Sequence, residues 1–429
     1  MSGGAVLFIV LIILMMIGVP IGVAIGMSSI AAIVFGSLTL TPTFVAQNLV
    51  SGCDSFPIMA IPLFILAGAL MGEGGISRRL LSVCDVFFGR TYGGLAIVTV
   101  VVCMFFAAIS GSGPATVAAV GSMVIPTMLA QGYSKSFSLG LIAAAGSIGI
   151  IIPPSIPMVI YGVTTNTSIG DMFKAGFLPG ILVGVIMIIF CYLYSKKKGW
   201  KTPNPEPFSW KRAGKAIWEA KWALISPIII LGGIYGGFFT PTEAAAVSAI
   251  YSLLCGAFLH KELNFKSLMK TIAEACSTTG TTMIIIGCAT AFAKILTMEQ
   301  IPQLVTSAIH GLTDNKILIL ILINVLLLIV GCFMDTTPAI MVLAPILLPI
   351  VTSFGMSPIH FGIIMVVNLA IGYVTPPLGV DLFVAARVGR TKLETVIKGI
   401  VPFIVCMIIA LLLITYIEPI SMLIPNLIH

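Results

Sequence analysis

Charged residues are scarce in this sequence, and their scarcity excludes most classes of protein. Asp, Glu, Lys and Arg make up 9% of the 429 residues, against about 25% in an average soluble domain. Hydrophobic residues make up 59%, and the mean hydropathy is +1.15. A water-soluble fold cannot bury that much apolar surface, so soluble enzymes, nucleic-acid-binding proteins and disordered chains are excluded. No nucleic acid is therefore expected as a partner.

Catalytic and metal-binding motifs are also missing. The nine cysteines and four histidines are scattered, and no pair of cysteines has the spacing of a metal site. The sequence has no Walker A motif for ATP, and no Ser/His/Asp set or His-Glu-x-x-His motif for hydrolysis. We therefore expect no enzyme activity and no transition metal. An ion gradient remains as the energy source if the chain transports a solute.

Long apolar runs are what the sequence does contain. Runs of 17 or more residues, rich in Leu, Ile, Ala and Gly, recur from end to end. They lack the alternation of about ten residues that is typical of a transmembrane β-barrel. Their length suits helices that cross a bilayer. The sequence therefore predicts an all-α polytopic membrane protein.

The two halves of the chain share three motifs in the same order, which indicates an internal duplication. The matching pairs, at offsets of 221 to 224 residues, are Val19-Pro20 with Thr240-Pro241, Ser112-Gly-Pro114-Ala115 with Thr336-Thr-Pro338-Ala339, and Gly149-x-x-x-Pro153-Pro154 with Gly372-x-x-x-Pro376-Pro377.

A basic segment separates the two halves. Residues 195–222 hold eight of the 22 Lys and Arg residues and all four tryptophans. Such a composition is typical of a helix lying on the cytoplasmic membrane surface. We therefore predict a first repeat at 1–194, an interfacial linker at 195–222 and a second repeat at 223–429.

Each half contains two short apolar helices on either side of a polar tip rich in Gly, Pro, Ser or Thr. These pairs, at 93–130 and 317–352, are predicted to be re-entrant hairpins that end near the middle of the membrane. Non-helical backbone survives at that depth only where protein or a water-filled cavity satisfies it. After each hairpin comes a long helix interrupted by two prolines, which leave main-chain carbonyls without donors.

The loop charges give the predicted orientation. Counting hairpins as non-crossing, 19 of the 22 Lys and Arg residues fall on one side, which the positive-inside rule assigns to the cytoplasm. The loops on that side are 73–92, 131–136, 195–222, 260–276 and 386–396, the last taken with Lys398. The result is ten crossings, five in each half, with both termini periplasmic. Because five is odd, the two repeats must be inverted relative to each other.

The hairpin tips are the predicted sites. Ser110, Gly111, Ser112 and Gly113 offer hydroxyl groups and close backbone approach, and Asp335, Thr336 and Thr337 do so in the second half. The helix after each tip aims its first amides at the tip, which suits an anionic group. Inverted repeats with broken helices are typical of secondary transporters.

The broken helices are predicted to bind a cation. Free carbonyls at Gly149–Pro153 and Gly372–Pro376 suit a hard cation such as Na⁺, and Thr375 adds a hydroxyl there. The alternative is that Gly, Ser and Thr only let helices pack closely in lipid. Close packing is the better explanation for an isolated Ser or Thr. The clusters at the tips, which occur in both halves, favour ligand binding instead.

The few charges inside or next to apolar segments are interpreted separately. Intramembrane carboxylates are expected to be functional, which singles out Asp335 and Asp381. Glu243 fits a functional role and a helix N-terminal charge equally well, and Lys294 is expected to extend its charge to the membrane surface. Arg387 and Arg390 are interpreted mostly as orientation signals.

Six motifs together resemble the large membrane subunit, the DctM-like type, of tripartite ATP-independent periplasmic (TRAP) transporters, and the resemblance covers essentially the whole chain. The motifs are Gly18-Val-Pro-Ile21, Ile61-Pro-Leu-Phe64, Ser110-Gly-Ser-Gly-Pro114, Ile151-Ile-Pro-Pro-Ser-Ile-Pro157, Thr240-Pro-Thr-Glu-Ala244 and Thr375-Pro-Pro-Leu-Gly379.

This resemblance implies the function and the partners. It implies Na⁺-coupled uptake of an organic-acid anion across the bacterial inner membrane by an elevator motion, with two or more Na⁺ as coupling ions. The implied partners are a small four-helix membrane subunit, expected to be a separate polypeptide, and a periplasmic substrate-binding protein, besides the membrane lipids.

The resemblance also implies site residues. The implied Na⁺ ligands are Ser110, Ser112, Gly149 and Ile152 in the first half and Gly331, Gly372, Thr375 and Leu378 in the second. The implied substrate contacts at the two tips and the broken helix are Ser112, Gly113, Pro114, Thr116, Asp335, Thr336, Thr337 and Asp381.

Several functional alternatives remain open at the level of sequence. Members of the resembled family carry C4-dicarboxylates, sialic acids and other acids, and general similarity leans slightly towards sialic acid. A stand-alone Na⁺/anion symporter of related fold would need no binding protein. A channel or a membrane enzyme fits the sequence less well.

Overall fold

The structure is a computed structural model that describes residues 2–36, 40–202, 208–312 and 315–428. Its secondary structure in these ranges is helical, apart from one isolated bridge between Tyr92 and Lys201. In the first half the α-helices are α1 (Gly3–Met16), α2 (Ile21–Phe35), α3 (Thr43–Cys53), α4 (Ala60–Glu73), α5 (Ile76–Phe88), α6 (Gly94–Ser110), α7 (Gly113–Ala130), α8 (Lys135–Ser147), α9 (Ile156–Thr165) and α10 (Ile169–Lys198).

In the second half they are α11 (Trp210–Tyr235), α12 (Pro241–Leu254), α13 (Phe265–Met298), α14 (Ile301–Leu312), α15 (Lys316–Phe333), α16 (Thr336–Ser353), α17 (Pro358–Gly372), α18 (Val380–Val388), α19 (Leu393–Tyr416) and α20 (Pro419–Leu427). Among the described residues, nine helical segments are long and apolar enough to cross a membrane. The protein is therefore an all-α, multi-pass membrane protein, as predicted. The count of ten crossings stays a prediction, and α1 and α2, with 14 and 15 residues, are shorter than a full span.

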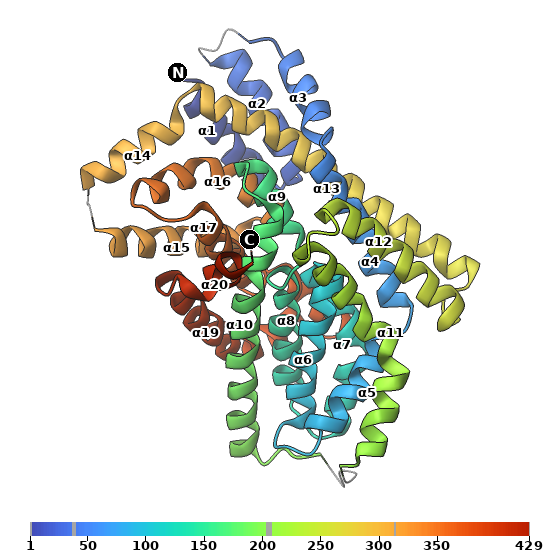
Figure 1. Cartoon of the computed structure of the whole chain (residues 1–429). Coiled ribbons are helices and arrows are strands. Elements are labelled where there is room, and N and C mark those ends of the chain that lie inside the picture. The colour runs from blue at the N-terminus through green and yellow to red at the C-terminus, as the bar shows by residue number, and fades with distance from the viewer. Residues whose placement is uncertain (1, 37–39, 203–207, 313–314, 429) are drawn as a thin grey trace.

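The helices form two packed groups (Figure 1). The scaffold group comprises α1–α5 and α11–α14, in which α13 packs against α2, α3 and α4, and α12 against α4. The hairpin group comprises α6–α10 and α15–α20. The two groups meet mainly where α4 and α5 pack against α6 and where α13 and α14 pack against α16.

Both predicted hairpins are present. In α6–α7 and in α15–α16, a turn of only two residues joins two helices of 17 or 18 residues. Their outer limits lie within one residue of the predicted 93–130 and 317–352. Each hairpin is followed by an interrupted helix, α8–α9 in the first half and α17–α18 in the second.

The two halves exchange contacts in a symmetric way. The first hairpin packs through α7 on α8 of its own half and on α18 of the other half. The second hairpin packs through α16 on α17 of its own half and on α9 of the other. Each hairpin thus packs against the first segment of the interrupted helix of its own half. It also packs against the second segment of the interrupted helix of the other half.

Two stretches of the sequence, one apolar and one basic, are each divided between two helices. The apolar residues 44–72 contain α3, which ends at Cys53, and α4, which follows a short 3₁₀ turn at Phe56–Met59. The polar Asp54 and Ser55 and the proline at 57 interrupt this stretch. The linker 195–222 contains the end of α10, which extends to Lys198, and the start of α11, which runs without a break from Trp210 to Tyr235. Its place on the membrane surface stays a prediction.

Glu243 belongs to a helix cap. Its carboxylate accepts hydrogen bonds from the Thr240 amide and hydroxyl, both at 2.8 Å, while the Thr240 hydroxyl oxygen accepts the Glu243 amide at 3.3 Å. This reciprocal arrangement satisfies first-turn donors of α12. Of the two interpretations left open by the sequence, the structure favours the helix N-terminal one.

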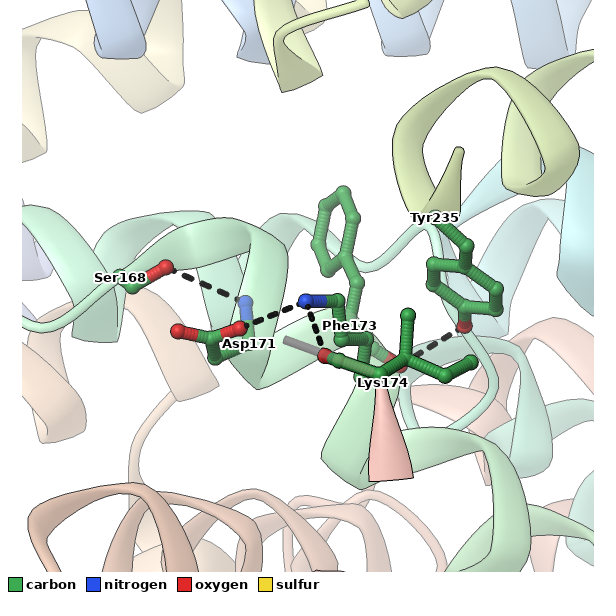
Figure 2. A network of polar contacts seen from close by, with 6 residues as sticks. Ser168, Asp171, Phe173, Lys174 and Tyr235 are labelled. Atoms are coloured by element: carbon green, nitrogen blue, oxygen red, sulfur yellow. Dashed lines mark hydrogen bonds and ion pairs between the residues drawn. The ribbon is translucent and has the colours of Figure 1, made fainter. Parts of the chain in front are cut away.

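A small polar network fastens the last helix, α20, to the start of α10 (Figure 2). The Lys174 ammonium donates to the Asp171 carboxylate and to the Ile428 carbonyl, both at 3.0 Å. The Tyr235 hydroxyl at the end of α11 donates to the Phe173 carbonyl at 3.0 Å. Three helices far apart in the sequence are therefore tied together at one point.

The loops that follow the two hairpins give a test of the inverted topology. Ser134 and Ser357 both precede the first segment of an interrupted helix, α8 and α17, and both are N-cap residues. Replacing each by cysteine, in a background without the nine native cysteines, should give labelling from opposite faces. A membrane-impermeant thiol reagent outside intact cells should reach the cysteine at 357 and not the one at 134.

Labelling of both cysteines from outside would contradict the inversion. The neighbouring Tyr133 is unsuitable for this test because it is 3% exposed and packs against Phe137 and Trp200. A cysteine at 133 would be protected from reagent on either side of the membrane.

Candidate functional site

The first hairpin tip is a compact cluster of hydroxyls and carbonyls. Gly111 adopts a positive φ of 61°, which a side chain would strain, and lets the chain turn from α6 into α7. The Thr116 hydroxyl donates to the Ser112 carbonyl at 2.7 Å and lies 3.1 Å from the Ser110 hydroxyl. Ser110 and Thr116 are buried. The tip therefore presents several oxygens within one small region.

The interrupted helix of the first half approaches this tip backbone to backbone. A Cβ added to Gly149 would lie 2.7 Å from the Ser112 carbonyl oxygen and from the Thr116 hydroxyl. On the other side, the Gly111 carbonyl accepts the Ile156 amide at 3.5 Å. Three of the four implied first-half Na⁺ ligands, Ser110, Ser112 and Gly149, are thus brought together.

The second half repeats this arrangement with different residues. A Cβ added to Gly372 would lie 2.5 Å from the Gly331 carbonyl carbon, so only two glycines allow this approach. The Leu378 amide donates to the Cys332 carbonyl at 3.3 Å, just as the Ile156 amide donates to the Gly111 carbonyl in the first hairpin. The implied ligands Gly331, Gly372 and Leu378 therefore also meet at one place.

The carbonyls of the two breaks are only partly free. The Gly372 carbonyl accepts the Thr375 amide at 3.1 Å, and the Thr375 hydroxyl donates to the Ile371 carbonyl at 2.7 Å. Within the described residues, no hydrogen bond reaches the carbonyls of Ile152 or Leu378. These two carbonyls and the oxygen lone pairs of Thr375 remain able to hold a cation.

A single cavity of about 660 Å³ lies between the two tips and the scaffold group. Predicted site residues that line it are Ser110, Ser112, Pro114, Asp335, Thr336 and Thr337. The scaffold group contributes Thr278 and Thr282 of α13, together with Glu274, whose carboxylate lies 3.8 Å from the Lys270 ammonium. The structure thus brings both predicted tips to one chamber.

The second tip is fixed by a hydrogen-bond cluster at the cavity wall. The Asp335 carboxylate accepts the Thr336 amide at 2.6 Å and the hydroxyl of Tyr373, and the Tyr373 and Thr336 hydroxyls lie 3.0 Å apart. Asp335 also caps α16. Its charge is therefore already engaged by the helix terminus and by Tyr373, which lines the cavity as well.

Three predicted substrate contacts lie outside the cavity lining. Asp381 is completely buried, and its two carboxylate oxygens have no hydrogen-bond partner among the described residues. A Cβ added to Gly113 would lie 2.8 Å from one of those oxygens. Thr116 is buried behind the first tip. At these positions, the three residues are better placed to support the tips than to contact a ligand in the cavity.

Arg387 is the residue that the sequence interpretation missed. It stands in the last turn of α18, is exposed, and lines the same cavity as Glu274 of α13. The sequence favoured an orientation signal because the residue follows an interrupted helix on the basic side. The position of α18 against α7, which only the fold provides, brings this cation to both tips.

Transition-metal chemistry finds no ligand set here. Among the described residues, no group of three His, Cys, Asp or Glu side chains is close enough to hold a metal ion. Hydroxyl and carbonyl oxygens at the tips are instead the groups that hold hard cations and hydrogen-bond to acid anions.

A likeness to a solved structure extends over the whole fold. The structure aligns with the Alcanivorax borkumensis YdaH transporter, described as having an unusual topology, with a TM-score of 0.63. The alignment covers 93% of this chain and 98% of that one, at 16% sequence identity. At this identity the likeness concerns the fold alone.

Relatives with known names are more similar in sequence. The isethionate TRAP transporter permease protein DctMQ of Oleidesulfovibrio alaskensis is 52% identical over 92% of this chain. The matched region spans 62% of the length of that relative. The C4-dicarboxylate TRAP transporter large permease protein DctM of Pseudomonas aeruginosa is 42% identical, over 89% of both chains. The sialic acid TRAP transporter large permease protein SiaM of Vibrio cholerae is 37% identical, over 90% of both.

The family assignment follows from these matches together with the motifs. Residues 8–420 match the family described as the tripartite ATP-independent periplasmic transporter, DctM component. This confirms the resemblance carried by the six motifs, and it confirms that the relatives are transporter permeases and not enzymes. The chain therefore belongs to the DctM component family of tripartite ATP-independent periplasmic transporters.

Proposed function

We propose that this protein takes up an organic-acid anion by Na⁺-coupled secondary transport. One observation carries the proposal: both hairpin tips and Arg387 line a single chamber of about 660 Å³. The chamber combines hydroxyls, a helix N-terminus and a guanidinium group, which are the usual partners of carboxylates. Secondary transporters place their substrate sites between such repeats.

Coupling to Na⁺ is supported by the repeated glycine contacts behind each tip. Gly149 approaches Ser112 and Thr116 of the first tip, and Gly372 approaches Gly331 in the helix before the second tip, so the break of an interrupted helix lies against each hairpin. A cation bound there would join tip and break into one unit. We therefore assign one Na⁺ to each half, with two or more ions for each substrate.

The substrate is proposed to be a small acid with at least one carboxylate or sulfonate. The relatives are named for isethionate, C4-dicarboxylates, sialic acid and 2,3-diketo-L-gulonate, and all of these carry an acidic group. Isethionate and C4-dicarboxylates are the first candidates, because the two relatives of highest identity named above carry those names. The lean towards sialic acid has no further support.

The partners and the location are part of the same proposal. We assign the protein to the bacterial inner membrane with periplasmic termini, together with a small membrane subunit and a periplasmic binding protein that delivers the substrate. An elevator motion would move the hairpin group along the scaffold group. The hairpin group contacts the scaffold group mainly through α6 and α16, which pack against α4, α5, α13 and α14, and these are the contacts along which it would move.

Uptake into proteoliposomes tests the proposal. The protein, the small subunit and candidate binding proteins loaded with isethionate, a C4-dicarboxylate or sialic acid are combined, and uptake is measured with external Na⁺ or choline at fixed pH. We expect uptake that rises steeply with external Na⁺ and requires a loaded binding protein. Equal uptake in choline would contradict the coupling, and uptake of free anion without any binding protein would favour a stand-alone symporter.

A further inference from the structure

A second cavity, of about 430 Å³, lies between the same two groups of helices. Its lining contains the hydroxyls of Ser51, Ser55, Thr164, Thr290 and Thr297 and the amide of Asn166. Lys294 of α13 is the one charged side chain among its described lining residues. The cavity therefore has a net positive charge and several hydrogen-bonding groups, which suits an anion.

The Lys294 ammonium is held in place from the scaffold side. It donates to the side-chain carbonyl of Asn48 on α3, and the Asn48 amide in turn donates to the Phe44 carbonyl at 2.7 Å. Asn48 is buried, with 4% of its surface exposed. Asn48 is neutral, so it orients the ammonium without cancelling its charge. A lysine that merely extends to the membrane surface would need no such partner.

The two cavities lie along the same four helices. Both are lined by residues of α4, α9, α13 and α16. On each helix, the residue of the second lining that lies nearest the first lining is a buried apolar side chain: Ile61, Ile160, Ile286 or Met341. Thr278 in the first cavity and Lys294 in the second are 16 residues apart on α13, or about 24 Å along its axis.

We propose that Lys294, oriented by Asn48, is the anion-receiving residue of the outer entrance, where a carboxylate or sulfonate substrate lies before the hairpin tips enclose it. This proposal rests on the proposed function. In the predicted topology, the 260–276 loop is cytoplasmic, so the cavity at Thr278 opens inward and the cavity at Lys294 lies on the periplasmic side. The four buried apolar side chains form the part of the second lining that is nearest the first cavity along each helix.

The charge of Lys294 can be measured without knowing the substrate. Thr297 lines the same cavity one turn further along α13 and is exposed. A cysteine replacing Thr297, in a background without native cysteines, is treated with two methanethiosulfonate reagents. One carries an ethylsulfonate anion and the other a trimethylammonium cation. The ratio of their reaction rates reports the local electrostatic potential.

We expect Lys294→Gln to lower the anion-to-cation rate ratio at position 297 by about tenfold, and Lys294→Arg to preserve it. Labelling by a neutral reagent shows that each variant is inserted and accessible. The matched control is a cysteine replacing Ser357, outside this cavity lining, whose ratio should not respond to Lys294→Gln. An unchanged ratio at 297, or an equal fall at both positions, would overturn the proposal.

Uptake by the complete transporter separates this proposal from the proposed function. If the wild type transports a binding-protein-delivered anion, Lys294→Gln should raise the KM for that anion about tenfold and leave Na⁺ activation unchanged. An unchanged KM would overturn the role of Lys294 while Na⁺-coupled transport stands. If the wild type transports no candidate anion with Na⁺, the proposed function fails, and the reagent ratios still decide whether Lys294 sets the potential of its cavity.

Discussion

Gly372→Ala is expected to reduce the initial rate of Na⁺-driven uptake by about fivefold to a hundredfold. The added methyl group would lie 2.5 to 2.6 Å from three backbone atoms of Gly331. Both partners are main chain, so no flexible side chain can move aside. Overpacking of this kind costs about 1–3 kcal/mol, and about 1.4 kcal/mol corresponds to a tenfold change.

The controls for Gly372→Ala come from the same chain. Gly280 lies on α13, and a Cβ added there meets no atom within 4 Å, so Gly280→Ala should leave uptake unchanged. Gly149→Ala should repeat the loss in the first half, because its Cβ would lie 2.7 Å from the Ser112 carbonyl oxygen. Na⁺ activation curves that coincide for Gly372→Ala and the wild type would contradict a coupling site at this contact.

Arg387→Gln is expected to raise the KM for the transported anion by about tenfold to a hundredfold, with Na⁺ activation preserved. Arg387 lines the chamber together with both tips, and among the described residues no ion pair within 4.0 Å involves its guanidinium. It is therefore available to a substrate carboxylate. Hydrogen bonds to charged groups contribute about 1.5–3 kcal/mol, which sets the range.

The Arg387 prediction is checked by uptake kinetics at saturating Na⁺. Arg387→Lys should show an intermediate KM, because lysine keeps the charge but loses the bidentate geometry. Arg390→Gln is the matched control, since Arg390 follows α18 and does not line the chamber. If Arg387→Gln and Arg390→Gln had the same kinetics, Arg387 would be an orientation signal after all.

The hairpins could be predicted from the sequence because their signals are local. Gly111 provides the positive φ that the first turn needs, and Asp335 caps the helix that follows the second tip. Pairs of prolines mark both breaks. Such residues act within a few positions of themselves, so the limits of 93–130 and 317–352 are within one residue of the observed ones.

Other features depend on contacts between distant segments and had no sequence signal. Arg387 reaches the chamber only because α18 packs against α7, and Asp381 is buried behind the first tip for the same reason. Tyr133 follows a polar turn, yet Trp200 and Phe137 bury it. Lys294 is oriented by Asn48, which is 246 residues away in the chain.

The most direct test of the central claim is the ratio of Na⁺ flux to substrate flux. Proteoliposomes containing the protein, its small subunit and a loaded binding protein are given ²²Na⁺ and a radiolabelled anion together, and both are counted over the initial phase. We predict at least two Na⁺ for each substrate molecule, and loss of both fluxes together in Gly372→Ala. Substrate uptake with no accompanying Na⁺ entry would contradict the account.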